Sequence, residues 1–349
     1  TLREGDDISI NGSTGEVFAG GIKTADSELK QVLVAGTMKP KESRVYQDFE
    51  FVMDLADRYR RLGVRTNSDT PEQVRQAVEA LRANGINKIN LDLVYGLPHQ
   101  TLEGLEQNLE LVRHLHPDRI ALFGYAHVPF FKKHQKLIPE SALPGVEERL
   151  AMANFAESWL TGHGYHAIGL DHFALADDEL AAAARLGVLH RNFQGYTVDN
   201  APALLGLGAS AIGALPHAYV QNHAMVSDYR TALAQDRLPV AKGIVLTADD
   251  RLRRDIIEQI MCFLTVDLGS TCEAHGRGAD AMDWALPLLA PLEACGAVRR
   301  SGRLIWVCPT QKSATRLLAS VFDAYLAKGA ARHSVPGSSA MPPSRPLGG

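Results

Sequence analysis

The sequence predicts an α/β fold in which a partial parallel (β/α) barrel is followed by a helical domain. From residue 71 to 247, apolar segments of strand length alternate with segments of helical period, the pattern of parallel β/α units. After residue 247 helical periods dominate, whereas residues 1 to about 30 are rich in Gly, Ser, Thr and Asp. We therefore expect four regions, at 1–70, 71–247, 248–330 and 331–349.

The amino-terminal region predicts a β-hairpin and one helix. Apolar residues alternate on both sides of the pair Asn11-Gly12, which favours a tight turn between two strands. Between residues 46 and 62 the apolar residues follow a helical period that ends at Gly63.

The second region begins with a clear helix start. Thr70 precedes Pro71, and Gln73 completes a capping box, while Gly85 ends the helix. A strand is expected over 86–94. The following elements alternate in the same way: helix 101–114, strand 119–125, helix 146–160, strand 165–170, helix 177–186 and an apolar stretch at 204–212.

Functional residues are expected in the loops that follow the strands. Active sites of parallel sheets lie beyond the carboxyl ends of the strands. The loops after Val94, Tyr125, Leu170 and Ile212 are therefore the places to search.

The third region is predicted to contain helices at 249–263, 281–295 and 312–327. A hairpin is expected at 298–307, between the last two helices. Ser301-Gly302 forms the hairpin turn, and the arrangement is similar to a winged helix. A winged helix can bind DNA, but the alternative, packing against the preceding domain, is favoured. The tail, rich in Pro, Gly and Ser, is expected to be disordered.

Composition limits the possible partners. Net charge is −4, from 36 basic and 40 acidic residues, so no general attraction to nucleic acid or to an anionic membrane is expected. No apolar run is long enough for a membrane-spanning helix, and the first residues do not form a targeting segment. We expect a cytoplasmic protein. The four cysteines fit neither a disulfide framework nor a metal knuckle and are expected to be free thiols: Cys262, Cys272, Cys295 and Cys308.

Two segments concentrate polar and aromatic residues, at 169–173 and 190–196. In these segments His172 and Arg191 are the candidate ligand-binding residues. Arginine binds carboxylates, aromatic rings stack on flat ligands, and amides orient a ligand through hydrogen bonds. The segments therefore suit a planar ligand that bears carboxylates. The alternative is an ordinary loop anchored by its aromatic residues.

Asp92 is a further candidate because it interrupts an otherwise apolar strand. A strand buried on both faces offers a carboxylate no water, so we expect Asp92 to have a donor partner from the protein or from a ligand.

Four segments together resemble a known family. They lie at 89–98, 123–129, 169–174 and 189–197, and the last reads Leu-His-Arg-Asn-Phe-Gln-Gly-Tyr-Thr. Residues 71–330 thereby resemble oxygen-independent coproporphyrinogen III dehydrogenase, a radical S-adenosylmethionine (SAM) enzyme of porphyrin and haem biosynthesis. The resemblance implies the partial barrel of the radical SAM type. It also implies an oxidoreductase in which a 4Fe-4S cluster and SAM drive oxidative decarboxylation of two propionates of the porphyrinogen.

The resemblance also assigns residues to the ligands. By that likeness, Asp92 and Ala126 contact the SAM that the cluster holds. Phe193, Gln194 and Ile244 line the region of a second SAM or of the substrate. No residue is assigned as catalytic or as a metal ligand.

The sequence departs from the family at the cluster. The family's CxxxCxxC motif is absent from this sequence, and three thiolates are needed to hold a cluster with one open iron. We therefore expect no cluster on this chain and no activity from it. Two alternatives stay open, a module that binds SAM or porphyrin without catalysis, and a fusion or fragment without function. An incomplete barrel would also expose a sheet edge, which favours self-association.

The amino-terminal region resembles a different family. Residues 2–6, 8–17 and 61–71 are similar to pyruvate phosphate dikinase, at the end of its phosphohistidine domain. Neither the phosphorylated histidine nor the barrel residues of that enzyme are present, so we expect the region 1–70 to be non-catalytic.

Overall fold

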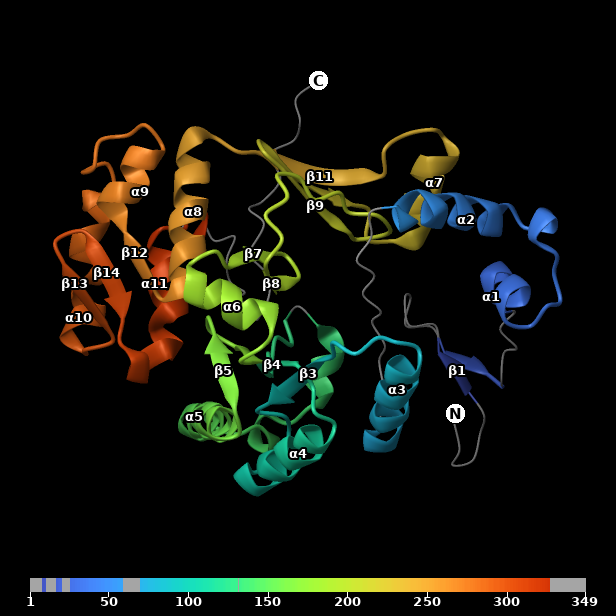
Figure 1. Cartoon of the computed structure of the whole chain (residues 1–349), viewed down its shortest axis with the longest axis horizontal. Helices are drawn as coiled ribbons and strands as arrows, with labels where there is room; N and C mark the ends of the chain where they lie inside the picture. Colours follow the sequence, from blue (N-terminus) through green and yellow to red (C-terminus); the bar gives the residue numbers. More distant parts are fainter. Residues whose placement is uncertain (1–7, 11–16, 21–25, 59–69, 131, 327–349) are drawn as a thin grey trace. The chain divides into compact units, whose positions relative to one another are not determined.

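The computed structural model describes residues 8–10, 17–20, 26–58, 70–130 and 132–326, and the chain divides into two units, Thr1–Asn67 and Ser68–Gly349 (Figure 1). The first unit contains the antiparallel pair β1 (Ile8–Ile10) and β2 (Val17–Ala19), which confirms the predicted hairpin. The pair Asn11-Gly12 and the predicted helix end at Gly63 lie outside the described residues.

The helices of the first unit are largely exposed. They are α1 (Glu28–Leu33), the 3-10 helix η1 (Pro40–Glu42) and α2 (Arg44–Asp57). Among the side chains that the structure describes in this unit, only Ser43 is buried, and it donates a hydrogen bond of 2.5 Å to Glu28. These elements therefore do not form a core within the described part of the unit.

The second unit begins with a four-stranded sheet in the order β3-β4-β6-β5. The strands are β3 (Asn90–Tyr95), β4 (Arg119–Gly124), β5 (Tyr165–Ile168) and β6 (His172–Leu175). The associated helices are α3 (Pro71–Ala83), α4 (Leu102–His114), α5 (Val146–Gly162) and α6 (Glu179–Leu186). The α/β class and the parallel β3–β4 pair confirm the predicted fold class.

One face of this sheet is covered by α4 and α5 (Figure 1). Leu105, Leu109, Ile120 and Leu160 are fully buried there, and one face of β3 packs against them. Two 3-10 helices, η2 (Lys133–Leu137) and η3 (Glu140–Ala142), connect β4 to α5. The described strands do not close into a barrel.

One part of the parallel prediction was wrong. The chain turns back after β5, so β6 lies antiparallel to both β5 and β4. Gly169, with φ +55°, makes this reversal possible because an L side chain rarely adopts that conformation. The expected strand over 165–170 therefore ends at Ile168.

Two antiparallel groups follow. The hairpin of β7 (His190–Asn192) and β8 (Gly195–Thr197) precedes a three-stranded sheet in the order β11-β10-β9. Its strands are β9 (Ile212–Leu215), β10 (Ala218–Asn222) and β11 (Val240–Val245), and α7 (Val226–Ala234) joins the last two. The apolar stretch at 204–212 makes only a bridge between Leu204 and Ala214.

The last part of the unit combines helices with a small sheet. It contains α8 (Ala248–Phe263), α9 (Leu268–Ala274), α10 (Ala290–Ala294), α11 (Thr315–Val321), and the 3-10 helices η4 (Asp283–Leu289) and η5 (Pro309–Ala314). The sheet has the order β12-β14-β13, with β12 (Thr265–Asp267), β13 (Val298–Ser301) and β14 (Leu304–Val307).

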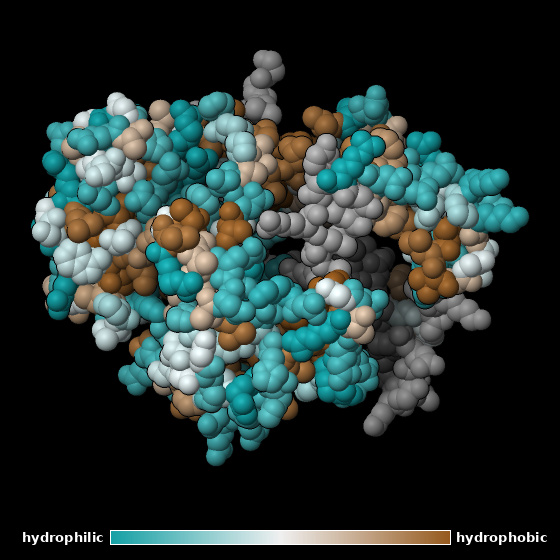
Figure 2. Space-filling model, in the orientation of Figure 1, coloured by the Kyte–Doolittle hydropathy of each residue, from teal (hydrophilic) through white to brown (hydrophobic). Residues whose placement is uncertain are grey.

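The core of this part lies between α8, α11 and the sheet. Ile256, Ile260, Leu268, Ile305 and Phe322 are fully buried in it. The predicted hairpin and winged-helix-like order are confirmed, but the helix expected over 281–295 is split into η4 and α10, which contain Pro287 and Pro291. On this unit the face in view is mostly hydrophilic, with separate hydrophobic patches (Figure 2).

Candidate functional site

Tyr196, on β8, is the centre of the candidate site. Its hydroxyl donates to the carbonyl of Met261 at 2.8 Å and accepts from the N–H of Leu170 at 3.0 Å. The ring therefore joins the β5–β6 turn to α8. Burial, followed by the nearby carboxylate of Asp171, raises the pKa of Tyr196, so the phenol stays neutral.

Gly169 allows this arrangement. A Cβ atom on Gly169 would lie 2.2 Å from the hydroxyl oxygen of Tyr196. Such a distance is far below van der Waals contact, so a side chain here would displace the tyrosine. Glycine is therefore required both by the turn and by the packing of the site.

His172, on β6, lies beside the ring of Tyr196. The centroids of the His172 and Tyr196 rings are 4.9 Å apart, and Phe123 on β4 contacts the same imidazole edge to face at 5.9 Å. Asp171 fixes the imidazole through a hydrogen bond of 2.8 Å to Nδ1. Arg316, on α11, donates to the other oxygen of Asp171 at 3.2 Å.

Three neighbouring side chains stabilise the carboxylate form of Asp171. Burial alone would raise the pKa of Asp171, but the hydrogen bond and charge of His172, together with the charges of Arg316 and Arg191, hold it below its ordinary value. Asp171 is therefore a carboxylate at neutral pH, and it orients His172 rather than exchanging a proton.

Arg191, on β7, has a buried donor without an acceptor. Its guanidinium lies 5.6 Å from the centroid of the Tyr196 ring. Its backbone N–H donates to Glu258 of α8 at 2.9 Å, and the same carboxylate oxygen lies 3.3 Å from Nδ1 of His190. The side-chain Nε of Arg191 is buried and has no hydrogen-bond partner among the described residues. An unsatisfied buried donor is costly, so this one is suited to an anionic ligand.

A cavity of about 600 Å³ opens beside Arg191. It lies between β7, the loop that follows β8, β10 and α8, and its walls include Phe193, Tyr219, Arg254 and Glu258. The rings of Phe193 and Tyr219 pack edge to face with centroids 5.1 Å apart. The cavity thus combines aromatic surfaces with two guanidinium groups.

The predicted site residues are only partly brought together. Arg191 and Phe193 line the cavity, whereas His172 is connected to it through Tyr196. Ile244 on β11 is paired with Tyr219, outside the lining. Gln194 is exposed at the β7–β8 turn, where its N–H donates to Asn192 at 2.8 Å.

Asp92 does not have the predicted environment. The prediction of a strand buried on both faces was wrong, because β3 is at an edge of its sheet and Asn90, Asp92 and Val94 are exposed. Asp92 accepts a hydrogen bond of 2.9 Å from the side chain of Asn90. The expected donor is thus supplied by the protein on a solvent-accessible face.

The loop after β4 contains Ala126. Its carbonyl accepts from Gln135 at 3.1 Å, and the same amide accepts from the N–H of Val128 at 2.6 Å, which fixes the loop. Tyr125 and His127 each have a buried polar atom, Oη and Nδ1, with no partner among the described residues. This loop therefore also contains groups suited to a polar ligand.

Sequence patterns did not identify several residues of the site. Tyr219, Arg254, Glu258 and Arg316 reach it from β10, α8 and α11. Glu258 is 67 residues from Arg191. Arg254 and Glu258 lie on the amphipathic helix α8, where charged residues are expected on the exposed face. Their place in the site is therefore evident only from the three-dimensional structure.

The cysteines do not fit an iron-sulfur cluster. Cys262, Cys272 and Cys308 are buried and Cys295 is exposed. Burial raises the pKa of Cys262 to about 12 and also raises the pKa of Cys272, whereas metal ligation requires thiolates. Within the described residues, no group of three His, Cys, Asp or Glu side chains could hold a metal ion.

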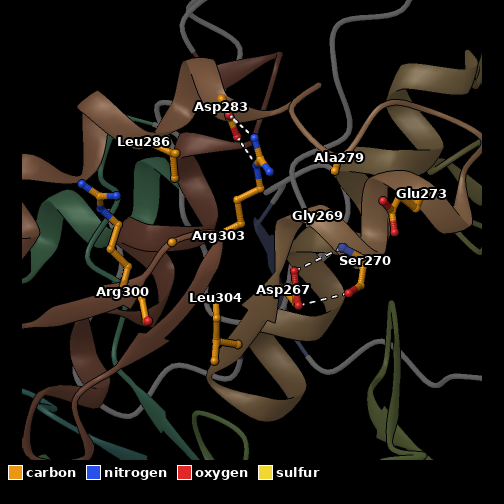
Figure 3. Close-up of a pocket in the computed structure, with 12 residues that line it drawn as sticks. Asp267, Gly269, Ser270, Glu273, Ala279, Asp283, Leu286, Arg300, Arg303 and Leu304 are labelled. Atoms are coloured by element: carbon orange, nitrogen blue, oxygen red, sulfur yellow. Dashed lines mark hydrogen bonds and ion pairs between the residues drawn. The ribbon is translucent and has the colours of Figure 1, made fainter.

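A second hollow, of about 520 Å³, lies on the carboxy-terminal part of the unit (Figure 3). Arg303 pairs there with both oxygens of Asp283 at 2.7 Å, and Asp267 accepts from Ser270. These charged groups satisfy one another and leave little for a ligand.

Among the described helices, none combines the length and the apolar character needed to cross a membrane.

Comparisons with known proteins show what the chain is similar to. No family model matches the chain. The chain is 47% identical over 263 residues to an oxygen-independent coproporphyrinogen III oxidase of Bradyrhizobium diazoefficiens. The aligned segment covers 75% of the chain and 58% of the relative. A relative of the same name from Synechocystis is 41% identical over 260 residues, covering 72% of the chain and 55% of the relative.

A solved structure shows the same relationship. The coproporphyrinogen III oxidase of Escherichia coli, described as a radical SAM enzyme, matches with a TM-score of 0.69 at 37% identity, over 74% of this chain and 60% of that one. The chain thus spans little more than half the length of these relatives. The resemblance inferred from the four sequence segments is confirmed, and by this homology about three quarters of the chain belongs to the family of oxygen-independent coproporphyrinogen III oxidases.

Proposed function

We propose that the chain binds a carboxylate-bearing tetrapyrrole of the coproporphyrinogen class in the cavity beside Arg191, without oxidising it. The observation that carries the proposal is the buried Nε of Arg191, which has no acceptor among the described residues. A propionate of the tetrapyrrole would accept from this guanidinium. Bidentate contacts between guanidinium and carboxylate groups are strong and directional.

The other walls suit the same ligand. Phe193 and Tyr219 offer aromatic surfaces to pyrrole rings, and Arg254 offers a second cation. The carboxylates of the cavity are already engaged within the protein: Glu258 accepts from the Arg191 N–H, and Asp255 lies 2.7 Å from Nε2 of His275 and 3.2 Å from Nε of Arg254. The volume of about 600 Å³ lies within the usual range for small-molecule sites.

The remaining assignments stay predictions. They include SAM contacts at Asp92, Ala126, Gln194 and Ile244, the cytoplasmic location, the exclusion of nucleic acid and the relation of the segment 1–70 to pyruvate phosphate dikinase. The two unsatisfied atoms in the loop after β4, on Tyr125 and His127, are compatible with SAM or with further polar groups of the tetrapyrrole.

Substitution of Arg191 tests the proposal. Titration calorimetry with coproporphyrin III is expected to detect binding by the full chain. The variant Arg191→Met should weaken it by about tenfold or more, since a hydrogen bond to a charged group contributes about 1.5–3 kcal/mol.

The matched control is Arg299→Met, which removes an exposed arginine of β13 outside the cavity. It should bind coproporphyrin III like the unsubstituted chain. Absence of binding by the unsubstituted chain, or equal losses in the two variants, would contradict the proposal. A titration with SAM in parallel distinguishes the two ligand classes.

We also expect that this chain does not assemble a cluster. After anaerobic incubation with iron and sulfide, the purified chain should show neither the absorption nor the electron paramagnetic resonance signal of a 4Fe-4S centre, and it should not oxidise coproporphyrinogen. The reason is that three of the four thiols are buried and cluster ligation needs converging thiolates. A bound cubane or turnover to protoporphyrinogen would refute this expectation.

A further inference from the structure

Arg254, on α8, is the second arginine that lines the cavity beside Arg191. Its side chain is 38% exposed, and its Nε lies 3.2 Å from a carboxylate oxygen of Asp255. Burial lowers the pKa of Arg254, but Tyr219 and Asp255 raise it above its ordinary value. A guanidinium has five N–H donors, so Arg254 keeps donors for a ligand after its contact with Asp255.

The two guanidinium groups of the cavity have different neighbours. The guanidinium of Arg191 lies 5.6 Å from the centroid of the Tyr196 ring. The guanidinium of Arg254 instead interacts with the side chains of Tyr219 and Asp255. The two cations therefore occupy separate parts of the cavity.

The helix α8 fixes the spacing between these two parts. Glu258 follows Arg254 by four residues, so both side chains lie on the same face of α8. An α-helix rises about 1.5 Å per residue, which separates the two positions by about 6 Å along the axis. Glu258 accepts from the backbone N–H of Arg191 at 2.9 Å. The backbone of Arg191 is thus held about one helical turn from Arg254.

An aromatic surface joins the two arginines. Phe193 follows Arg191 by two residues, and Tyr219 interacts with Arg254. The two rings line the cavity and pack edge to face with centroids 5.1 Å apart. The cavity therefore suits a flat apolar body that has carboxylates at two separate points of its rim.

We infer that Arg254 is a specificity-determining residue, which binds a second propionate of the ligand whose first propionate is bound by Arg191. The two propionates belong to neighbouring pyrrole rings. The cavity thereby prefers tetrapyrroles with two free propionates in this arrangement to tetrapyrroles with only one. This inference rests on the proposed function, because it requires a tetrapyrrole in the cavity.

Two probes that differ by one charge test the inference. Mesoporphyrin IX has two propionates on neighbouring rings, and in its monomethyl ester one of them is neutral. In titration calorimetry the unsubstituted chain should bind the diacid about fivefold or more tightly than the ester. This preference is smaller than that of a buried ion pair because Arg254 is partly exposed.

Substitutions of Arg254 assign the preference to this side chain. Arg254→Met should bind the diacid and the ester with nearly equal affinity, because the second propionate has lost its cation. Arg254→Lys keeps a positive charge and should recover part of the preference. Arg299→Met, outside the cavity, should keep all of it. Circular dichroism checks that each variant folds.

The ratio of the two affinities distinguishes a specific contact from a structural effect. Equal affinity of the unsubstituted chain for both probes, or an Arg254→Met variant that weakens both by the same factor, would overturn the inference. Binding of coproporphyrin III but of neither probe would also overturn it. In each case the proposed function stands if Arg191→Met still weakens the binding of coproporphyrin III. Absence of binding of all three porphyrins would instead overturn the proposed function itself.

Discussion

Replacement of Asp178 by alanine is expected to lower the free energy of unfolding of the second unit by about 3–5 kcal/mol, the usual cost of removing one partner of a buried ion pair. The carboxylate is fully buried, and both of its oxygens lie 2.9 Å from Nε of Arg119 at the start of β4. Asp178 also accepts from the N–H of Leu180 and so caps α6. The substitution therefore removes an ion pair and a helix cap together.

The neighbouring residue provides a matched control. Asp177 is 79% exposed, and its nearest cation, Lys88, lies 3.8 Å away, so Asp177→Ala should change stability by less than about 0.5 kcal/mol. Urea unfolding followed by circular dichroism compares the two variants. Similar midpoints for both would show that the buried pair does not hold α6 to β4.

The effect of Asp178 extends to the candidate site through packing. Leu180, Ala181 and Ala183 of α6 form one buried cluster with Ile168, Leu189 and Tyr196. A displaced α6 would therefore loosen Tyr196 and the start of β7. We expect the same variant to bind coproporphyrin III more weakly, although Asp178 does not line the cavity.

Local signals made the helices of the second unit predictable. Thr70, Pro71 and Gln73 specify the start of α3, and the structure shows both hydrogen bonds of the capping box there. The apolar periods of α4, α5 and α8 extend over three or more turns, long enough to be distinguished from strands. These elements depend mainly on residues within their own segment.

Apart from the two predicted hairpins, the antiparallel elements could not be predicted because their strands are short. β6 has four residues, and its direction depends on the conformation of Gly169. The exposure of Asp92 depends on the absence of a described neighbour beyond β3. In the site, the sequence segment 189–197 indicated Arg191 and Phe193, but the contacts of Arg191 with Glu258 and of Phe193 with Tyr219 arise only from tertiary packing.

Gly169→Ala is the substitution expected to affect the site most directly. Its Cβ would lie 2.2 Å from the hydroxyl of Tyr196 and 2.3 Å from Cζ, so the ring must move. Movement breaks the hydrogen bonds to Met261 and Leu170 and leaves their backbone groups unpaired in a buried region. With about 1–2 kcal/mol of left-handed strain and about 1–3 kcal/mol for each of the two unpaired groups, we expect the unfolding free energy to fall by about 3–8 kcal/mol.

Gly302→Ala isolates the contribution of the Tyr196 contact. Gly302 has φ +60°, close to the +55° of Gly169, but a Cβ there would meet no atom within 4 Å. This variant should therefore lose only the strain, about 1–2 kcal/mol, and keep its affinity for coproporphyrin III. Gly169→Ala should lose both stability and binding, because Tyr196 supports the guanidinium of Arg191 and the imidazole of His172 alike. Equal unfolding midpoints and equal affinities in the two variants would mean that Tyr196 does not organise the site.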